Sequence, residues 1–175
     1  MINKLLTNLG LTILRLISSL PISFLNALGG GSGLIGYYLL KKRRNVGLLN
    51  LSLCFPEMGE AEKNHLIKEH FKELIRSGLC YGLIFYASPD KLRKVVEIRG
   101  LENYNKVRGQ IPVVLLAPHF LALDIGANRL TLETPGYSVY AEQRNAYLTE
   151  RIKQARLRFI KDQGGEIFSR REGLR

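Results

Sequence analysis

His119 and Asp124 are the residues of this chain whose types and spacing could carry out proton transfer. They stand in the run His119-Phe-Leu-Ala-Leu-Asp124, and every residue between them is apolar. A neutral imidazole accepts a proton near neutral pH, and a carboxylate at its second ring nitrogen fixes the tautomer and stabilises the imidazolium. The pair therefore predicts a general base, His119, that is oriented by an acid, Asp124.

The elements around this pair must bring the two side chains together. The apolar run 113–117 (VVLLA) predicts a buried strand, and Pro118 ends it because proline has no N–H to donate to a sheet. Residues five apart on one helix point roughly 140° away from each other, so the pair meets only if a helix begins after His119. The same spacing also fits a His119 that caps the helix and an unrelated Asp124 on the surface.

Arginines recur in the last third of the chain. The candidates for ligand binding among them are Arg144, Arg151, Arg156, Arg158, Arg170 and Arg171. A guanidinium suits phosphate because its planar fork donates two parallel hydrogen bonds. The pattern fits two interpretations: an amphipathic surface helix followed by a basic tail, or side chains that bind an anionic ligand.

The cysteines and the remaining histidines give no metal-ligand spacing. Cys54 and Cys80 are isolated, and His65 and His70 lie in a charged segment that predicts a solvent-facing helix. The G-x-S-x-G pattern of a serine nucleophile is also absent. We therefore predict no metal, no cofactor and no covalent intermediate, and the cysteine usage suits a reducing compartment.

Positive charge is concentrated before residue 57. The net charge is +11, and residues 1–56 contain Lys4, Arg15 and the run 41–44 (KKRR) but no acidic residue. Such a chain predicts an anionic partner. Because these cations lie beside an apolar N-terminus, a lipid surface is favoured over nucleic acid. No zinc-finger, helix-turn-helix or aromatic RNA-binding pattern occurs in the sequence.

Residues 1–40 form an apolar N-terminus for which three interpretations compete. Leu5–Leu28 is about as long as a bilayer-spanning helix, but Arg15 and Pro21 interrupt it, and the glycine cluster 29–33 is expected to break the chain. The segment fits a membrane span, a helix lying in the lipid interface, or a signal peptide. The basic run 41–44 opposes export and keeps the following residues on the cytoplasmic side, so we favour a single span or deep anchor.

The whole pattern predicts an α/β fold: an open sheet flanked by helices, with an N-terminal membrane-anchoring helix. The expected elements after the basic run are a helix over 57–86, a strand over 95–98 ended by Gly100, a short helix or turn over 101–109, the strand and helix around His119, a turn at 134–136, a strand over 137–140, a helix over 142–158, a break at 164–165 and a strand over 167–168. We divide the chain into a membrane anchor (1–40), a helical lead-in (41–90) and the beginning of a catalytic domain (91–175).

Three motifs together resemble a known group of enzymes. The H-x4-D run after a hydrophobic strand resembles block one of the glycerolipid and lysophospholipid acyltransferase superfamily, and Gly165-Glu-Ile-Phe-Ser-Arg170 resembles its second block. The run Arg43-Arg44-Asn45-Val46, followed by 50–57 (NLSLCFPE), is similar to the segment before the catalytic domain of the bacterial lipid A late acyltransferases, the lauroyl and myristoyl transferases of the Kdo2-lipid A pathway.

The resemblance implies a reaction and a location. It implies transfer of a fatty acyl chain from acyl-acyl carrier protein to a hydroxyl of a lipid A precursor at the bacterial inner membrane, with His119 as base and Asp124 orienting it. Arg170 matches the arginine of block two, Arg171 is its rival because the alignment can slip by one, and Arg144 joins them as a candidate for binding the anionic acceptor. Members of the family continue beyond a region of this length, so we expect an incomplete domain. The alternatives are an acyltransferase for another glycolipid or phospholipid, and a non-catalytic membrane-anchored basic scaffold.

Overall fold

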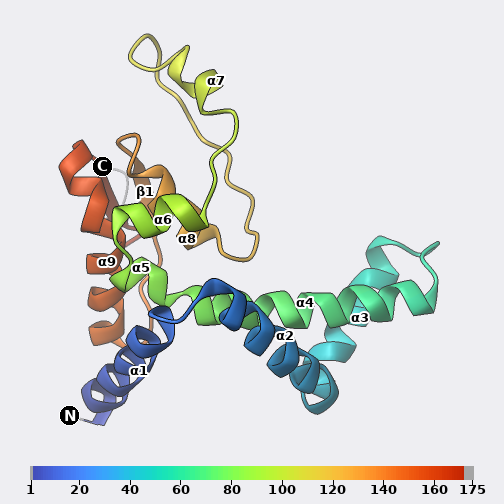
Figure 1. Cartoon of the computed structure of the whole chain (residues 1–175). Coiled ribbons are helices and arrows are strands. Elements are labelled where there is room, and N and C mark those ends of the chain that lie inside the picture. The colour runs from blue at the N-terminus through green and yellow to red at the C-terminus, as the bar shows by residue number, and fades with distance from the viewer. Residues whose placement is uncertain (1, 172–175) are drawn as a thin grey trace. The chain divides into compact units, whose positions relative to one another are not determined.

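The structure, a computed structural model, describes residues 2–171, so residues 172–175 of the predicted basic tail lie outside it. It divides into two compact units, one formed by Ile17–Cys80 and the other by Met1–Leu16 with Tyr81–Arg175. Each unit has its own cluster of buried apolar side chains. The elements, labelled in Figure 1 where there is room, are α1 (Ile2–Ser18), α2 (Ile22–Leu39), α3 (Lys41–Cys54), α4 (Glu60–Cys80), α5 (Gly82–Tyr86), α6 (Pro89–Val95), α7 (Leu101–Asn105), α8 (Leu123–Leu130), β1 (Tyr137–Tyr140), α9 (Ala146–Ile160), the short 3-10 helix η1 (Lys161–Gln163) and β2 (Glu166–Ser169).

In the unit Ile17–Cys80, glycines let two helices pack backbone to backbone. α2 runs through the cluster 29–33 without a break, so the interruption predicted there is wrong. A Cβ atom on Gly33 would lie 2.7 Å from the Lys72 backbone nitrogen, and one on Gly29 would lie 2.9 Å from Arg76 Cα. The close approach of α4 to α2 therefore depends on residues without a side chain.

The apolar N-terminus is divided between two helices. α1 ends at Ser18 and α2 begins at Ile22, so Leu5–Leu28 is not one continuous helix. Pro21 precedes α2 with a φ of −59°, a value that suits the start of a helix. Within residues 2–171, none of the helices combines the length and the apolar character that crossing a membrane requires.

The other unit contains a strand–helix–strand crossover. β1 and β2 pair in parallel, with Tyr137 opposite Glu166 and Tyr140 opposite Ser169, and α9 connects them. Leu157 and Ile160 of α9 pack against Ile167 of β2 to form the core. The predicted strands over 137–140 and 167–168 are confirmed. Within the described residues the sheet has these two strands, so the α/β class is confirmed in a mostly helical form.

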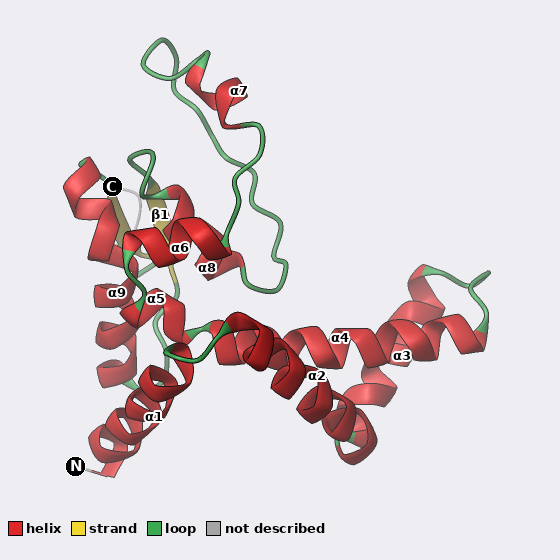
Figure 2. Ribbon diagram, viewed as in Figure 1, coloured by secondary structure: helices red, strands yellow, loops and turns green. Residues whose placement is uncertain are grey.

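Two predicted strands do not form. Residues 95–98 were expected to be a strand, but Val95 is the last residue of α6, and residues 96–98 lack regular secondary structure. Ser88 caps the start of α6 by accepting a hydrogen bond from the Lys91 backbone nitrogen. Residues 112–120 lack regular secondary structure (Figure 2), and Val114 and Leu116 are 94% and 96% exposed. A strand persists only when a neighbour completes its hydrogen bonds, and no described strand lies beside 113–117.

Candidate active site

Asp124 is held by side chains from two other parts of its unit. Arg156 Nη2, from α9, donates to both of its carboxylate oxygens, at 2.7 Å to Oδ1 and 2.9 Å to Oδ2. The Tyr81 hydroxyl, directly before α5, donates to Oδ2 at 2.9 Å. The Asp124 and Arg156 side chains are 29% and 28% exposed, so this ion pair is partly shielded from solvent. The arrangement fixes the orientation of a carboxylate that remains accessible.

The local sequence explains why Asp124 stands at this position. Ala122 adopts a left-handed conformation (φ 62°) before α8, and Asp124 follows in the first helical turn, where a negative charge is favourable. One turn later, Asn128 Nδ2 donates to the Asp124 carbonyl oxygen at 3.2 Å. Asn128 Oδ1 and Arg156 Nε are buried and have no hydrogen-bond partner among the described residues. The residues that contact Asp124 therefore retain one buried acceptor and one buried donor that are able to bond.

The electrostatics of the site keep Tyr81 a hydrogen-bond donor. Burial raises the pKa of its hydroxyl to about 12, and the negative charge of Asp124 and the hydrogen bond to it act in the same direction. Tyr81 is therefore neutral throughout the physiological pH range. Because it stays protonated, Tyr81 donates its hydrogen bond to Asp124 Oδ2 at every pH in that range.

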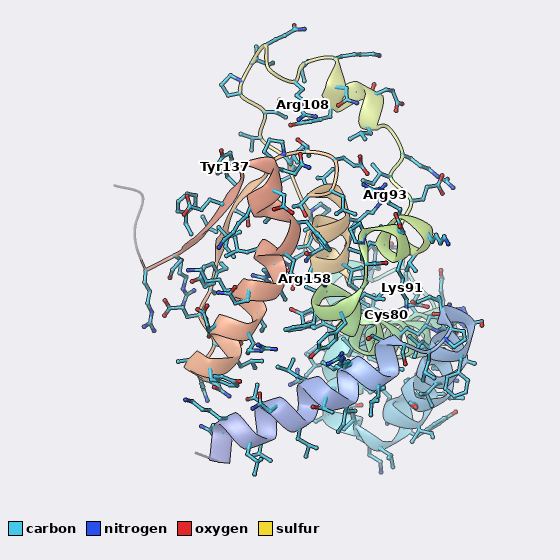
Figure 3. The ribbon with its side chains drawn as sticks, turned by 60° about the vertical axis from the view of Figure 1, so that its left-hand side comes forward. Cys80, Lys91, Arg93, Arg108, Tyr137 and Arg158 are labelled. Atoms are coloured by element: carbon cyan, nitrogen blue, oxygen red, sulfur yellow. The ribbon has the colours of Figure 1, made fainter. Side chains whose placement is uncertain are left out.

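A neighbouring arginine has a structural role. Arg158, labelled in Figure 3, donates to the carbonyl oxygens of Ile84 (2.9 Å), in the middle of α5, and of Ala87 (2.8 Å), directly after it. Burial lowers the pKa of its guanidinium. These bonds fasten α9 to α5 and so help to set the distance between Arg156 and Tyr81.

The predicted base precedes the helix that carries Asp124. His119 lies in the exposed segment before α8, which begins at Leu123, so the prediction of a helix that starts after His119 is confirmed. The hydrogen bonds to Asp124 come from Arg156 and Tyr81, and among residues 2–171 none is contributed by His119. A carboxylate offers about four acceptor positions, so the described contacts leave room for one more.

The predicted substrate-binding arginines lie at the ends of β1 and β2. Arg170 and Arg171 follow β2 and are exposed; the Arg170 backbone nitrogen donates to the Tyr140 carbonyl oxygen, and Arg171 Nη1 lies 3.1 Å from Glu142 Oε2. Arg144 is exposed between β1 and α9. A concave surface between α9 and β2 is lined by Lys153, Lys161 and Glu166 among others, but not by His119 or Asp124. Within the described residues no group of His, Cys, Asp and Glu could hold a metal ion.

Comparison with known proteins identifies the family. Residues 1–175 match the family described as bacterial lipid A biosynthesis acyltransferase. The chain belongs to this family. The resemblance drawn from its motifs is thereby confirmed.

Several lipid A biosynthesis acyltransferases are similar to this chain. The lipid A biosynthesis lauroyltransferase of Escherichia coli K12 is 31% identical over 141 residues, which is 80% of this chain and 46% of the relative. A lipid A biosynthesis acyltransferase of Haemophilus influenzae is 33% identical over 156 residues, covering 88% and 50%. The myristoyltransferase of Escherichia coli K12 is 29% identical over 171 residues, covering 95% and 51%. The chain thus spans about half the length of these relatives, and no solved structure matches it significantly.

In this lipid A acyltransferase family member, sequence reasoning missed two partners of the candidate acid. The sequence shows Arg156 only as one arginine among several, and the one cue is that it stands between the apolar residues Ala155 and Leu157, which the structure buries. Tyr81 lies in an apolar run (GLCYGLIF), and its hydroxyl is the only cue there that a polar partner is needed. Neither partner has a spacing from Asp124 that predicts the contact.

Proposed function

We propose that this chain supplies the proton-transfer site of an enzyme that moves a fatty acyl chain from an acyl thioester to a hydroxyl of a lipid A precursor. The match of residues 1–175 to the lipid A acyltransferase family carries this proposal. The relatives are named as acyl transferases of lipid A biosynthesis, including lauroyl and myristoyl transferases. The held Asp124, five residues after His119, is consistent with the proposed chemistry.

His119 acts as the general base in the proposed reaction. It takes the proton of the acceptor hydroxyl while that oxygen attacks the thioester carbonyl carbon. The carbon–sulfur bond then breaks, and the thiolate leaves with the proton that the imidazolium returns. The products are an ester and a free thiol, and no group of the protein is acylated.

Asp124 stabilises the imidazolium during this cycle. The proposal requires the second ring N–H of His119 to occupy the acceptor position that Arg156 and Tyr81 leave open. Because those residues fix the carboxylate, Asp124 does not need to reorient when the imidazole charges. The exposed segment that carries His119 is the part that adjusts.

The remaining partners of the proposed enzyme follow from charge and from the family. The acyl donor is acyl-acyl carrier protein, and the acceptor is an anionic glycolipid whose phosphates bind Arg144, Arg170 and Arg171. The enzyme works at the bacterial inner membrane with this part on the cytoplasmic side, where the basic run 41–44 belongs.

Acyl transfer by the full-length protein tests the proposal. The protein is incubated with acyl-acyl carrier protein and a lipid A precursor, and mass spectrometry follows the mass of the lipid. His119→Ala is expected to abolish the mass gain of one acyl chain while circular dichroism stays unchanged. His65→Ala, which removes an exposed histidine of α4, serves as the matched control and is expected to keep activity.

Two outcomes would replace the proposal. Wild-type activity in His119→Ala would show that another group takes the proton. No transfer to any glycolipid or phospholipid by the wild-type protein would favour a non-catalytic membrane-anchored scaffold, in which Asp124 serves only its ion pair with Arg156.

A further inference from the structure

α1 contacts the rest of its unit through a polar side. Hydrogen bonds join it to α5 and to the start of α9: Asn145 Nδ2 donates to Thr7 Oγ1 (3.0 Å), the Tyr147 hydroxyl to Asn8 Oδ1 (2.8 Å), and the Tyr86 hydroxyl to the Leu11 carbonyl oxygen (3.1 Å). Lys4 and Arg15 lie over the rings of Tyr147 and Tyr86. The side that an ordinary surface helix turns to solvent is here turned to the protein.

The opposite side of α1 is apolar and exposed. Its large aliphatic side chains are between 47% and 70% exposed, and they are Leu5, Leu6, Leu9, Ile13 and Leu16. At helical spacing these positions share an arc of about 100°, centred opposite Leu11, which is buried. Figure 1 shows α1 beside the N-terminal end of α9. Each of these side chains is about half exposed or more, and together they form a continuous apolar stripe.

Charge indicates what the stripe meets. α1 contains Lys4 and Arg15 and no acid, and the first acidic residue of the chain is Glu57. A second copy of α1 would bring further cations and no compensating charge. Anionic lipid headgroups would complement the cations while the acyl region receives the stripe. Tyr86 and Tyr147, which border α1, also suit the boundary between lipid and water.

We propose that α1 lies in the plane of a bilayer surface with anionic headgroups, with the stripe in the acyl region and the polar side carrying the rest of the unit. This deepens the proposed function, on which it rests for the lipid acceptor, by giving the orientation in which the site meets that lipid. It differs from the membrane span favoured by the sequence, in which α1 would stand across the bilayer.

The depth of each end of α1 distinguishes these orientations. The chain contains no tryptophan, so a single introduced tryptophan reports without background. Leu5→Trp and Leu16→Trp place it at the two ends of the stripe, about 16 Å apart along the helix axis. Quenching by lipids labelled at known depths, in phosphatidylglycerol–phosphatidylethanolamine vesicles, is expected to give the same shallow depth for both. Depths that differ by most of that length would overturn the proposal.

Vesicle binding by the full chain tests whether the apolar stripe of α1 contacts an anionic lipid surface. Wild-type protein is expected to sediment with phosphatidylglycerol-containing vesicles and much less with neutral phosphatidylcholine vesicles. The double variant Leu9→Gln, Ile13→Gln is expected to bind at least about tenfold more weakly. Leu53→Gln, on α3, changes a side chain that is 71% exposed and is the matched control, with binding close to wild type.

Other results would contradict the proposal. An equal loss in Leu53→Gln would show that binding reflects general hydrophobicity, and equal binding to neutral vesicles would exclude the anionic surface. A lipid-free dimer that the double variant abolishes would assign the stripe to a second copy. Because the assay contains no acyl donor, vesicle binding by an inactive His119→Ala protein separates this inference from the proposed function.

Discussion

Replacing Arg156 by alanine removes both charge-assisted hydrogen bonds from α9 to Asp124 and leaves the carboxylate with the Tyr81 hydroxyl. Exposed ion pairs contribute about 0–1 kcal/mol to stability, and breaking a fully buried one costs about 3–5 kcal/mol. The Arg156 and Asp124 side chains are 28% and 29% exposed, which is between these limits. We therefore expect Arg156→Ala to lower the free energy of unfolding by about 2 kcal/mol.

Urea unfolding followed by circular dichroism measures this loss. The matched control is Arg151→Ala, which removes an exposed arginine of the same helix and should change the free energy of unfolding by less than about 0.5 kcal/mol. In the double variant Arg156→Ala, Asp124→Asn the two losses should not add, with a coupling of about 1 kcal/mol or more. Equal stability of the Arg156 and Arg151 variants, or full additivity, would refute the reasoning.

The same substitution bears on catalysis. A carboxylate that is no longer fixed by α9 orients the imidazole less well, and misplacement of a catalytic group by about 1 Å can cost about 10²-fold in rate. In the full-length enzyme, Arg156→Ala should lower kcat by about that factor with little change in KM. Arg156→Lys keeps the charge but not the planar fork, and should recover part of the rate.

Two further predictions concern Tyr81 and the glycines of α2. Tyr81→Phe should lower the free energy of unfolding by about 1 kcal/mol at neutral pH. The folded pKa of Tyr81, about 12, exceeds the unfolded value of about 10, so its stabilisation is complete below about pH 10 and is lost as the pH rises toward 12. Urea unfolding of wild type and Tyr81→Phe at several pH values should therefore show the difference in their free energies of unfolding shrinking over this range. A difference that stays constant would contradict this prediction. Gly33→Ala should destabilise the protein by about 1–3 kcal/mol because its Cβ would meet the Lys72 backbone. Gly31→Ala, at a position of the same helix that faces open space, should be neutral or stabilising by up to about 1 kcal/mol. Thermal unfolding compares the two variants, and equal melting temperatures would contradict the close packing of α4 on α2.

Elements defined by local signals could be predicted from the sequence. The strand over 137–140 follows a Pro-Gly turn, and the strand over 167–168 follows Gly164, which adopts a left-handed conformation (φ 76°). The helix between them was also predicted, although it begins at Ala146, where Asn145 caps it by accepting from the Leu148 backbone nitrogen. Such turns and caps act over a few residues and can be recognised without the rest of the fold.

Features that depend on distant partners could not be predicted in this way. The apolar run 113–117 has strand composition, but composition does not show whether a neighbouring strand is present to pair with it. The cluster 29–33 contains the residues that usually break a helix, and only the position of α4 explains why α2 continues through it. Asp124 was expected to orient His119, but its contacts with Tyr81 and Arg156 bridge 43 and 32 residues of chain.

α9 bonds both to the first helix of the chain and to the candidate acid. Tyr147, in its first turn, is bonded to α1, and Arg156, nine residues later and about 14 Å along the axis, is bonded to Asp124. A helix rotates about its axis nearly as a rigid body, so the residue bonded to α1 and the residue bonded to Asp124 move together. A rotation of α9 that changes its contact with α1 also moves the Arg156 guanidinium relative to Asp124. The orientation of the carboxylate therefore depends on how α1 packs against α9.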